Sequence, residues 1–349
     1  MRLPQVWRSD LALDLKIGSG WSATVEAIFT KTLQDTKFET RNLKPISSPL
    51  GTADARPYFS GDKINPNFTS VFVVTNTQQG YRYNVSASIK KSTQNWNFSS
   101  HYTFGKSRDL ANGVRVSPQA NWEWNQTLDP NNPRLSYSNF DVRHRIISAA
   151  DVTFKLRKNM PTTISLVYLA NSGAPFTYIY TGDANRDGSP TNDLIYVPKD
   201  FAESNLVDVK NAAGQVTLSA NTQWENLNNY IENNAYLRSK RGTYTERNAG
   251  RTPWNQQLDM RILQQFVLKN GQRLQLSFDI INLSNFISKT WGRQYFVPNT
   301  TNAGYALLTF VKRENNQPQY RFDNPTNTPY QFDPIASRTQ GQIGLKYIF

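Results

Sequence analysis

Cysteine is absent from this chain of 349 residues, and long hydrophobic runs are absent as well. Without cysteine, the fold cannot rest on a disulfide scaffold, and no thiolate can hold a metal ion. No stretch reaches the ~18 to 20 consecutive apolar residues that a membrane-spanning helix needs. A membrane β-strand, however, needs only about 9–11 residues with every second one apolar. The composition therefore excludes helical membrane spans and leaves membrane strands open.

Signatures of nucleic-acid binding are also missing, although the net charge is +13. The chain has no run of five or more Lys and Arg residues and no helical pattern that could enter a groove. We therefore expect no nucleic-acid partner. Lys and Arg residues scattered along the chain in this way are better suited to contact lipopolysaccharide phosphates or to line a charged lumen.

Motifs of the common enzyme classes do not occur. The sequence contains no Gly-x-Ser-x-Gly, no phosphate-binding loop, no His-Glu-x-x-His and no dinucleotide fingerprint. The two histidines, His101 and His144, are far apart in the chain, and a lumen-lining or hydrogen-bonded role suits them better than metal binding or base catalysis. We do not expect an enzyme.

What the chain does have is an alternation of apolar and polar residues, which indicates strands with one apolar face. The segments with this pattern are 11–17, 21–29, 79–90, 96–104, 146–156, 164–168, 258–266, 274–280 and 341–349. Their polar face carries acids and bases, such as Glu26 and Arg82, which a water-filled lumen accepts. The solvent face of a soluble β-sandwich would look similar. The sequence predicts an all-β fold of about nine strands.

The connections between these segments favour a membrane barrel. Short turns near 18–20, 91–95, 157–161 and 269–271 alternate with long segments near 34–70, 107–142, 182–253 and 286–337. Outer-membrane barrels have short periplasmic turns and long extracellular loops. We therefore predict an antiparallel transmembrane β-barrel, with aromatic residues (13% of the chain) at the two membrane interfaces.

The expected number of strands is odd, which has a consequence for closure. The first and last strands then both run inward, so the C-terminus is expected in the periplasm. An antiparallel sheet with an odd number of strands cannot close without a parallel pair, and plugged barrels have about 22 strands. We expect residues 1–349 to form the C-terminal part of a larger barrel, with the remaining strands supplied upstream or by another chain. The first residues contain no signal peptide, so an exported chain would need an upstream segment.

The last nine residues, 341–349, end on an aromatic residue. Ile343, Leu345, Tyr347 and Phe349 share one side of the predicted strand. Chain ends are usually polar and frayed, so a terminal apolar strand suggests that the end is built into a sheet. This ending resembles the signal that the barrel-assembly machinery reads, although a soluble β-domain ending on a core strand has the same pattern.

Several segments resemble the C-terminal barrel region of TonB-dependent receptors, in particular the Oar-like branch. The resemblance covers most of the chain and rests on residues 2–7, 11–14, 24–29, 102–107, 182–198 and the end strand, of which only 182–198 is distinctive. It implies an outer-membrane receptor that takes up a ligand, with a plug inside the barrel. Neither the plug nor a TonB box is recognisable here, so contact with TonB is expected only through a missing N-terminal part.

Two other functions remain open at this stage. The chain could be a structural barrel subunit of a secretion or adhesion complex, without transport of its own, or a secreted all-β binding module.

An Asp- and Asn-rich stretch follows residue 182. Asp183, Asn185, Asp187 and Asp193 place oxygen ligands at positions that resemble a calcium loop. The stretch departs from the EF-hand pattern, because the twelfth position is Leu194 instead of Glu. A turn capped by its own side chains is the alternative. If calcium binds, we expect it to stiffen a long external loop.

Aromatic residues are frequent in the long segments. They include Trp122, Trp124, Tyr137, Trp224, Tyr230, Tyr236 and Trp254. Such residues can stack on sugar or peptide ligands, or pack on each other or at the upper interface. Because loops on a rigid scaffold carry binding residues, we expect the loops together to form the ligand-contacting surface.

Overall fold

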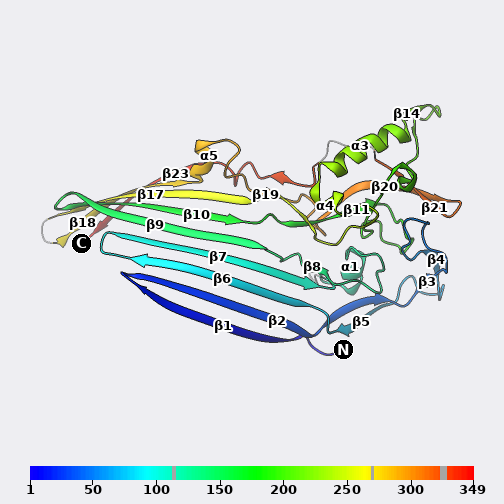
Figure 1. Ribbon diagram of the computed structural model, residues 1–349, viewed down its shortest axis with the longest axis horizontal. Coiled ribbons are helices and arrows are strands. Elements are labelled where there is room, and N and C mark those ends of the chain that lie inside the picture. Colours follow the sequence, from blue (N-terminus) through cyan, green and yellow to red (C-terminus); the bar gives the residue numbers. More distant parts are fainter. Residues whose placement is uncertain (112–114, 269–270, 323–327) are drawn as a thin grey trace.

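The computed structural model describes residues 1–111, 115–268, 271–322 and 328–349. Nine long strands follow one another in an antiparallel sheet, in the order β1-β2-β6-β7-β9-β10-β17-β18-β23 (Figure 1). We call these strands the strand wall: β1 (Gln5–Gly18), β2 (Trp21–Thr40), β6 (Tyr81–Ser92), β7 (Trp96–Asp109), β9 (His144–Arg157), β10 (Met160–Asn171), β17 (Asn255–Val267), β18 (Arg273–Ile281) and β23 (Gln340–Ile348). The predicted all-β fold is confirmed, and each predicted segment overlaps one of these strands.

The register of the strands places the apolar residues on one face. Val25 is paired with Leu13 on β1 and with Ala87 on β6, and all three are exposed. On the opposite face, Thr24 donates a hydrogen bond to Asp14 (2.6 Å). Period-two alternation is therefore expressed as a polar face and an apolar face, and this sheet buries neither of them in a protein core.

Short and long connections lie at opposite ends of the strand wall, as predicted (Figure 1). At one end, two or three residues join β1 to β2, β6 to β7 and β9 to β10. Residues 269 and 270 of the fourth predicted turn lie outside the described residues. At the other end, the long connections 41–80, 110–143, 172–254 and 282–339 fold together. We call these four connections the loop body.

The loop body has its own sheet and its own core, which the sequence analysis did not predict. Its main sheet has the order β16 (Gly250–Arg251), β11 (Pro175–Thr181), β20 (Gly304–Glu314) and β21 (Gln317–Arg321), and β11 is parallel to β20. Helices α3 (Ala220–Glu232) and α4 (Ala235–Arg238) pack beside it. Buried apolar residues from three connections, such as Leu50, Leu227 and Leu308, form the core.

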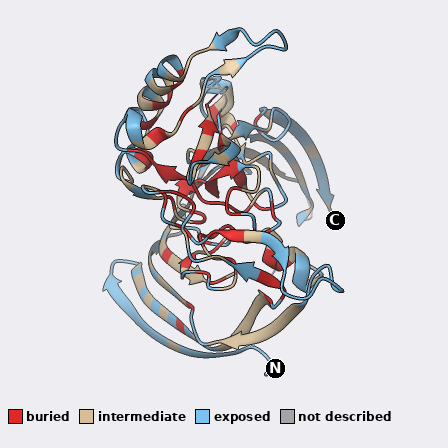
Figure 2. Cartoon of the chain, turned by 90° about the vertical axis from the view of Figure 1, so that its right-hand side faces the viewer, coloured by how far each residue is buried: buried red, intermediate tan, exposed pale blue. Residues whose placement is uncertain are grey.

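Buried residues are concentrated in the loop body, whereas the strand wall is largely exposed or intermediate (Figure 2). The shorter elements of the loop body are β3 (Leu43–Pro45), β4 (Phe59–Lys63), β5 (Phe72–Thr77), α1 (Pro118–Glu123), β8 (Ser136–Tyr137), β12 (Tyr196–Val197), α2 (Phe201–Ser204), β13 (Val209–Lys210), β14 (Val216–Leu218), β15 (Thr243–Tyr244), α5 (Leu283–Ile287), β19 (Tyr295–Phe296) and β22 (Gln331–Phe332). No helix in the described residues has the length and apolar character needed to cross a membrane.

The sheet is open. Within the described residues, β1 pairs only with β2, and β23 pairs only with β18. Both outer edges thus present unpaired backbone N–H and C=O groups, which are templates for further strands.

Candidate functional site

The apolar face of the strand wall is bordered by aromatic residues near both ends. Near the loop body, aromatic rings contact one another within β6, in the pair Tyr81–Tyr83, and between different segments, in the pairs Trp7–Phe29, Tyr83–Phe104, Phe104–His144 and His144–Trp254. Near the short turns, Trp21 and Trp96 meet edge to face, and the Lys91 ammonium lies over both rings. Two aromatic rows around an apolar band are typical of a barrel wall in a membrane.

His144 occupies a position in the upper aromatic row. Its Nδ1 atom is 2.7 Å from the hydroxyl of Tyr102, and its ring stacks on Trp254. The hydrogen-bonded role expected for this histidine agrees with that geometry. His101 lies on the polar face, opposite Ser88.

The C-terminal strand places its four apolar residues on the apolar face of the wall. Ile343 is opposite Phe278, Leu345 opposite Leu276, and Tyr347 opposite Leu274. Ile343, Leu345, Tyr347 and Phe349 are all exposed on this edge strand. The side chains of the predicted assembly signal are therefore accessible together with the unpaired strand edge.

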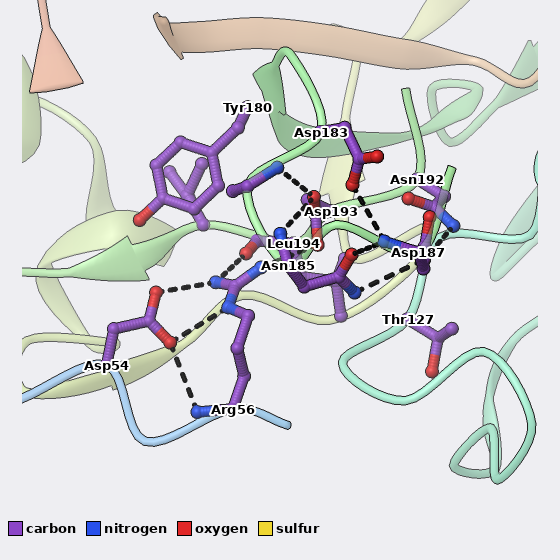
Figure 3. A network of polar contacts seen from close by, with 12 residues as sticks. Asp54, Arg56, Thr127, Tyr180, Asp183, Asn185, Asp187, Asn192, Asp193 and Leu194 are labelled. Carbon is purple, nitrogen blue, oxygen red and sulfur yellow. Dashed lines mark hydrogen bonds and ion pairs between the residues drawn. The ribbon is translucent and has the colours of Figure 1, made fainter. Parts of the chain in front are cut away.

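The predicted Asp- and Asn-rich loop folds as a tight turn that its own side chains cap (Figure 3). The carboxylate of Asp183 accepts hydrogen bonds from the backbone N–H groups of Asp187 (2.9 Å) and Gly188 (2.8 Å). The Asp187 carboxylate accepts from the amides of Asn185 (3.2 Å) and Asn192 (2.9 Å). Asp183, Asn185 and Asp187 are thus brought together in this turn.

Asp193 takes part in a different interaction, which the sequence did not predict. Its Oδ1 pairs with Nη1 of Arg56 (3.0 Å), and its Oδ2 accepts from the Ala184 N–H (2.8 Å). Arg56 is fully buried and also pairs with Asp54 through two 2.8 Å contacts (Figure 3). Its guanidinium lies over the Tyr180 ring as well. Arg56 therefore ties the first long connection to the Asp-rich loop.

Burial and mutual repulsion change the acidity of these carboxylates. Desolvation raises the pKa of Asp193 to about 6, although the Arg56 charge acts against the shift. Desolvation also raises the pKa of Asp187 well above its usual range, and the neighbouring Asp193 and Asp183 charges add to this. No cation is paired with Asp187 within the described residues.

The chemistry of this loop is compatible with a cation, but its present geometry is that of a capped turn. No group of three His, Cys, Asp or Glu side chains in the described residues is close enough to hold a metal. Asn192 is completely buried, and its Oδ1 has no hydrogen-bond partner. Calcium binding by Asp183, Asn185, Asp187 and Asp193 stays a prediction.

A cavity of about 720 Å³ lies elsewhere in the loop body, and two of the seven predicted loop aromatics line it, Tyr230 and Tyr236. The other five make internal contacts: Trp122 in a small core, Trp124 under Arg115, Tyr137 between Arg108 and Arg143, Trp224 beside Phe201, and Trp254 on His144. The packing interpretation thus applies to these five residues, whereas ligand stacking by Tyr230 and Tyr236 stays a prediction.

Comparison with known proteins agrees with this geometry. A family model described as an outer membrane beta barrel domain matches residues 1–321. No curated protein matches the chain.

Proposed function

Because the chain belongs to the outer membrane beta barrel domain family, we propose that it is the barrel portion of a TonB-dependent receptor of the Oar-like type. Such a receptor takes up a ligand across the outer membrane. The observation that carries the proposal is the loop body, which has its own core and holds a cavity above the strand wall. A barrel with a purely structural role has no need of a loop body that has its own core and a cavity.

The open edges of β1 and β23 support a larger assembly. Nine strands place β1 and β23 in the same direction, so an odd number of further strands is needed to keep every pair antiparallel. A total of about 22 strands would give room for a plug. We expect these strands, the plug and the TonB contact to come from parts of the receptor outside this sequence.

The orientation follows from the asymmetry of the connections. Long loops of outer-membrane barrels are extracellular, so we expect the C-terminus in the periplasm. There the exposed strand β23 would meet the barrel-assembly machinery. Lipopolysaccharide is the expected partner at the opposite interface, where the exposed Lys31 is paired with Trp7 and Tyr81.

A cell-based experiment tests the proposed uptake. Cells with and without the encoding gene are grown in a defined nutrient mixture, and the medium is analysed by mass spectrometry. Loss of the gene is expected to abolish depletion of at least one nutrient, and a protonophore is expected to have the same effect on the parent strain. Identical depletion with and without the gene, together with a failed secretion or adhesion complex, would favour the structural subunit instead.

A further inference from the structure

The cavity in the loop body is built from elements that lie next to the strand wall along the chain. One wall is Phe176 and Tyr178 on β11, which begins four residues after β10 ends. A second is Gly250 and Arg251 on β16, which ends four residues before β17 begins. The cavity therefore lies at the mouth of the β10–β17 strand pair.

The third wall is helix α3, whose sequence separates a buried face from an amide-bearing face. Gln223, Leu227 and Ile231 are the buried positions. Asn226 and Asn229, three residues apart and so on one side of the helix, line the cavity. Neither of these two side-chain amides makes a hydrogen bond within the described part of the chain. Each offers both donors and an acceptor to a ligand.

Tyrosine rings form a further part of the lining. The rings of Tyr178 and Tyr236 stack with centroids 6.3 Å apart, and the Tyr178 hydroxyl accepts from Asn234 (2.8 Å). Tyr230 and Tyr330 add two partly exposed rings. Burial raises the pKa of Tyr178 to about 12, so this phenol is neutral at physiological pH. The lining therefore combines flat aromatic faces with uncharged polar groups.

Charge is scarce among the described residues that line the cavity. None of them is acidic, and Arg251 is the only basic one. That guanidinium is already ion-paired with Asp141. Among these described residues a charged ligand would consequently find no free counter-ion, whereas a ligand rich in hydroxyl groups would find amides and phenols.

We propose that this cavity binds a short neutral oligosaccharide, and this assignment rests on the proposed receptor function. Sugar hydroxyls pair with the free amides of Asn226 and Asn229, and the apolar faces of sugar rings pack against the tyrosine rings. The volume of about 720 Å³ lies within the range of small-ligand sites. An uncharged peptide is the competing occupant, because its backbone also hydrogen-bonds to amides.

Calorimetric titration of the intact chain in detergent micelles tests the assignment. The probes are maltohexaose, cellohexaose, xylohexaose and laminarihexaose, with an oligogalacturonate and an end-capped hexa-alanine peptide as controls. At least one neutral hexasaccharide is expected to bind, and both controls are expected not to bind. Asn226→Ala and Asn229→Ala should each weaken sugar binding roughly three- to tenfold, the effect of losing one neutral hydrogen bond.

Asn221→Ala is the matched control, because Asn221 is exposed on the same helix and does not line the cavity. It should leave the affinity unchanged, and near-ultraviolet circular dichroism checks that all three variants are folded. The proposal is overturned if none of the neutral sugars binds, if the peptide binds instead, or if folded Asn226→Ala and Asn229→Ala proteins bind sugar as the parent does.

The outcome is separable from that of the receptor proposal. If the chain binds the sugar but its gene is not needed for nutrient uptake, the sugar site stands and the transport function is refuted. If the gene is needed for uptake but the chain binds no neutral sugar, the transport function stands and the sugar site is refuted.

Discussion

The strand wall and the loop body use the same kinds of apolar residue in opposite ways. In the wall, Val25 and Ile343 stand exposed on one face of a single sheet. In the loop body, Leu227 and Ile231 are almost completely buried on the inner face of helix α3. The difference teaches that the apolar side chains of the wall are suited to contact lipid outside the protein, whereas those of the loop body must pack on one another to avoid water.

Polar residues follow the same division. The polar face of the wall keeps its ionisable groups near water, as the Thr24–Asp14 hydrogen bond illustrates. The loop body instead buries an arginine and the carboxylates around it, so each of these charges depends on its partners. Substitutions in the two regions should therefore destabilise the folded protein for different reasons.

The largest effect is expected from removing the buried Arg56 of the loop body. Arg56→Ala leaves Asp54 and Asp193 buried without their partner, which costs about 3–5 kcal/mol in the free energy of unfolding. Arg41→Ala removes an exposed ion pair with Glu39 and should cost less than about 1 kcal/mol. Chemical denaturation followed by near-ultraviolet circular dichroism measures both values. Equal losses in the two variants would contradict the Arg56 network.

The next effect distinguishes the two faces of the wall. Ala87 and Ser88 are neighbours of similar size on β6, on the apolar and polar face respectively. Ala87→Arg should destabilise the protein in phospholipid bilayers by about 2–4 kcal/mol, because it places a charge in lipid. Ser88→Arg should cost far less. Urea unfolding in vesicles measures both, and a larger loss for Ser88→Arg would reverse the assignment of the faces.

A pH effect is expected in the loop body, and for each proton it is smaller per pH unit than the loss from a charge placed in lipid. The raised pKa values of Asp187 and Asp193 mean that the folded state binds more protons than the unfolded chain above the ordinary carboxyl pKa, and for Asp193 this window extends to about 6. Stability without divalent cations should thus fall as pH rises through that window, by about 1.4 kcal/mol per pH unit for each proton involved. Asp187→Asn should flatten the slope, and an unchanged slope would exclude Asp187 as its source.

Calcium should give the smallest effect. At tenfold excess over its dissociation constant, a cation bound only by the folded state stabilises it by about 1.4 kcal/mol. The parent chain should gain this on addition of calcium at pH 7 and lose it with a chelator, whereas Asp187→Asn should not respond. An equal response of both proteins would place the effect outside the loop of residues 183–193.

The strand wall was predictable from the sequence because each strand carries its own period-two signal and each short turn is local. The loop body was not, because its core joins pieces such as Leu50 and Leu308 through contacts between separate connections. The parallel pairing of β11 with β20 is equally non-local.

The Asp-rich loop shows the same limit on a smaller scale. Its capped turn was foreseeable, since Asp183 accepts hydrogen bonds from residues four and five positions away. Its partner Arg56 was not, since 137 residues separate it from Asp193. A single Arg in a polar segment gives no local signal of where its side chain will be buried.

The central claim is that one face of the strand wall contacts lipid. Because the chain has no cysteine, single cysteines can be introduced along β6 from residue 82 to residue 89 and spin-labelled in bilayers. If one face of the strand wall contacts lipid, labels at odd positions should collide preferentially with oxygen and labels at even positions with a water-soluble nickel complex. Accessibility without a period of two, or odd positions shielded from both reagents, would contradict it.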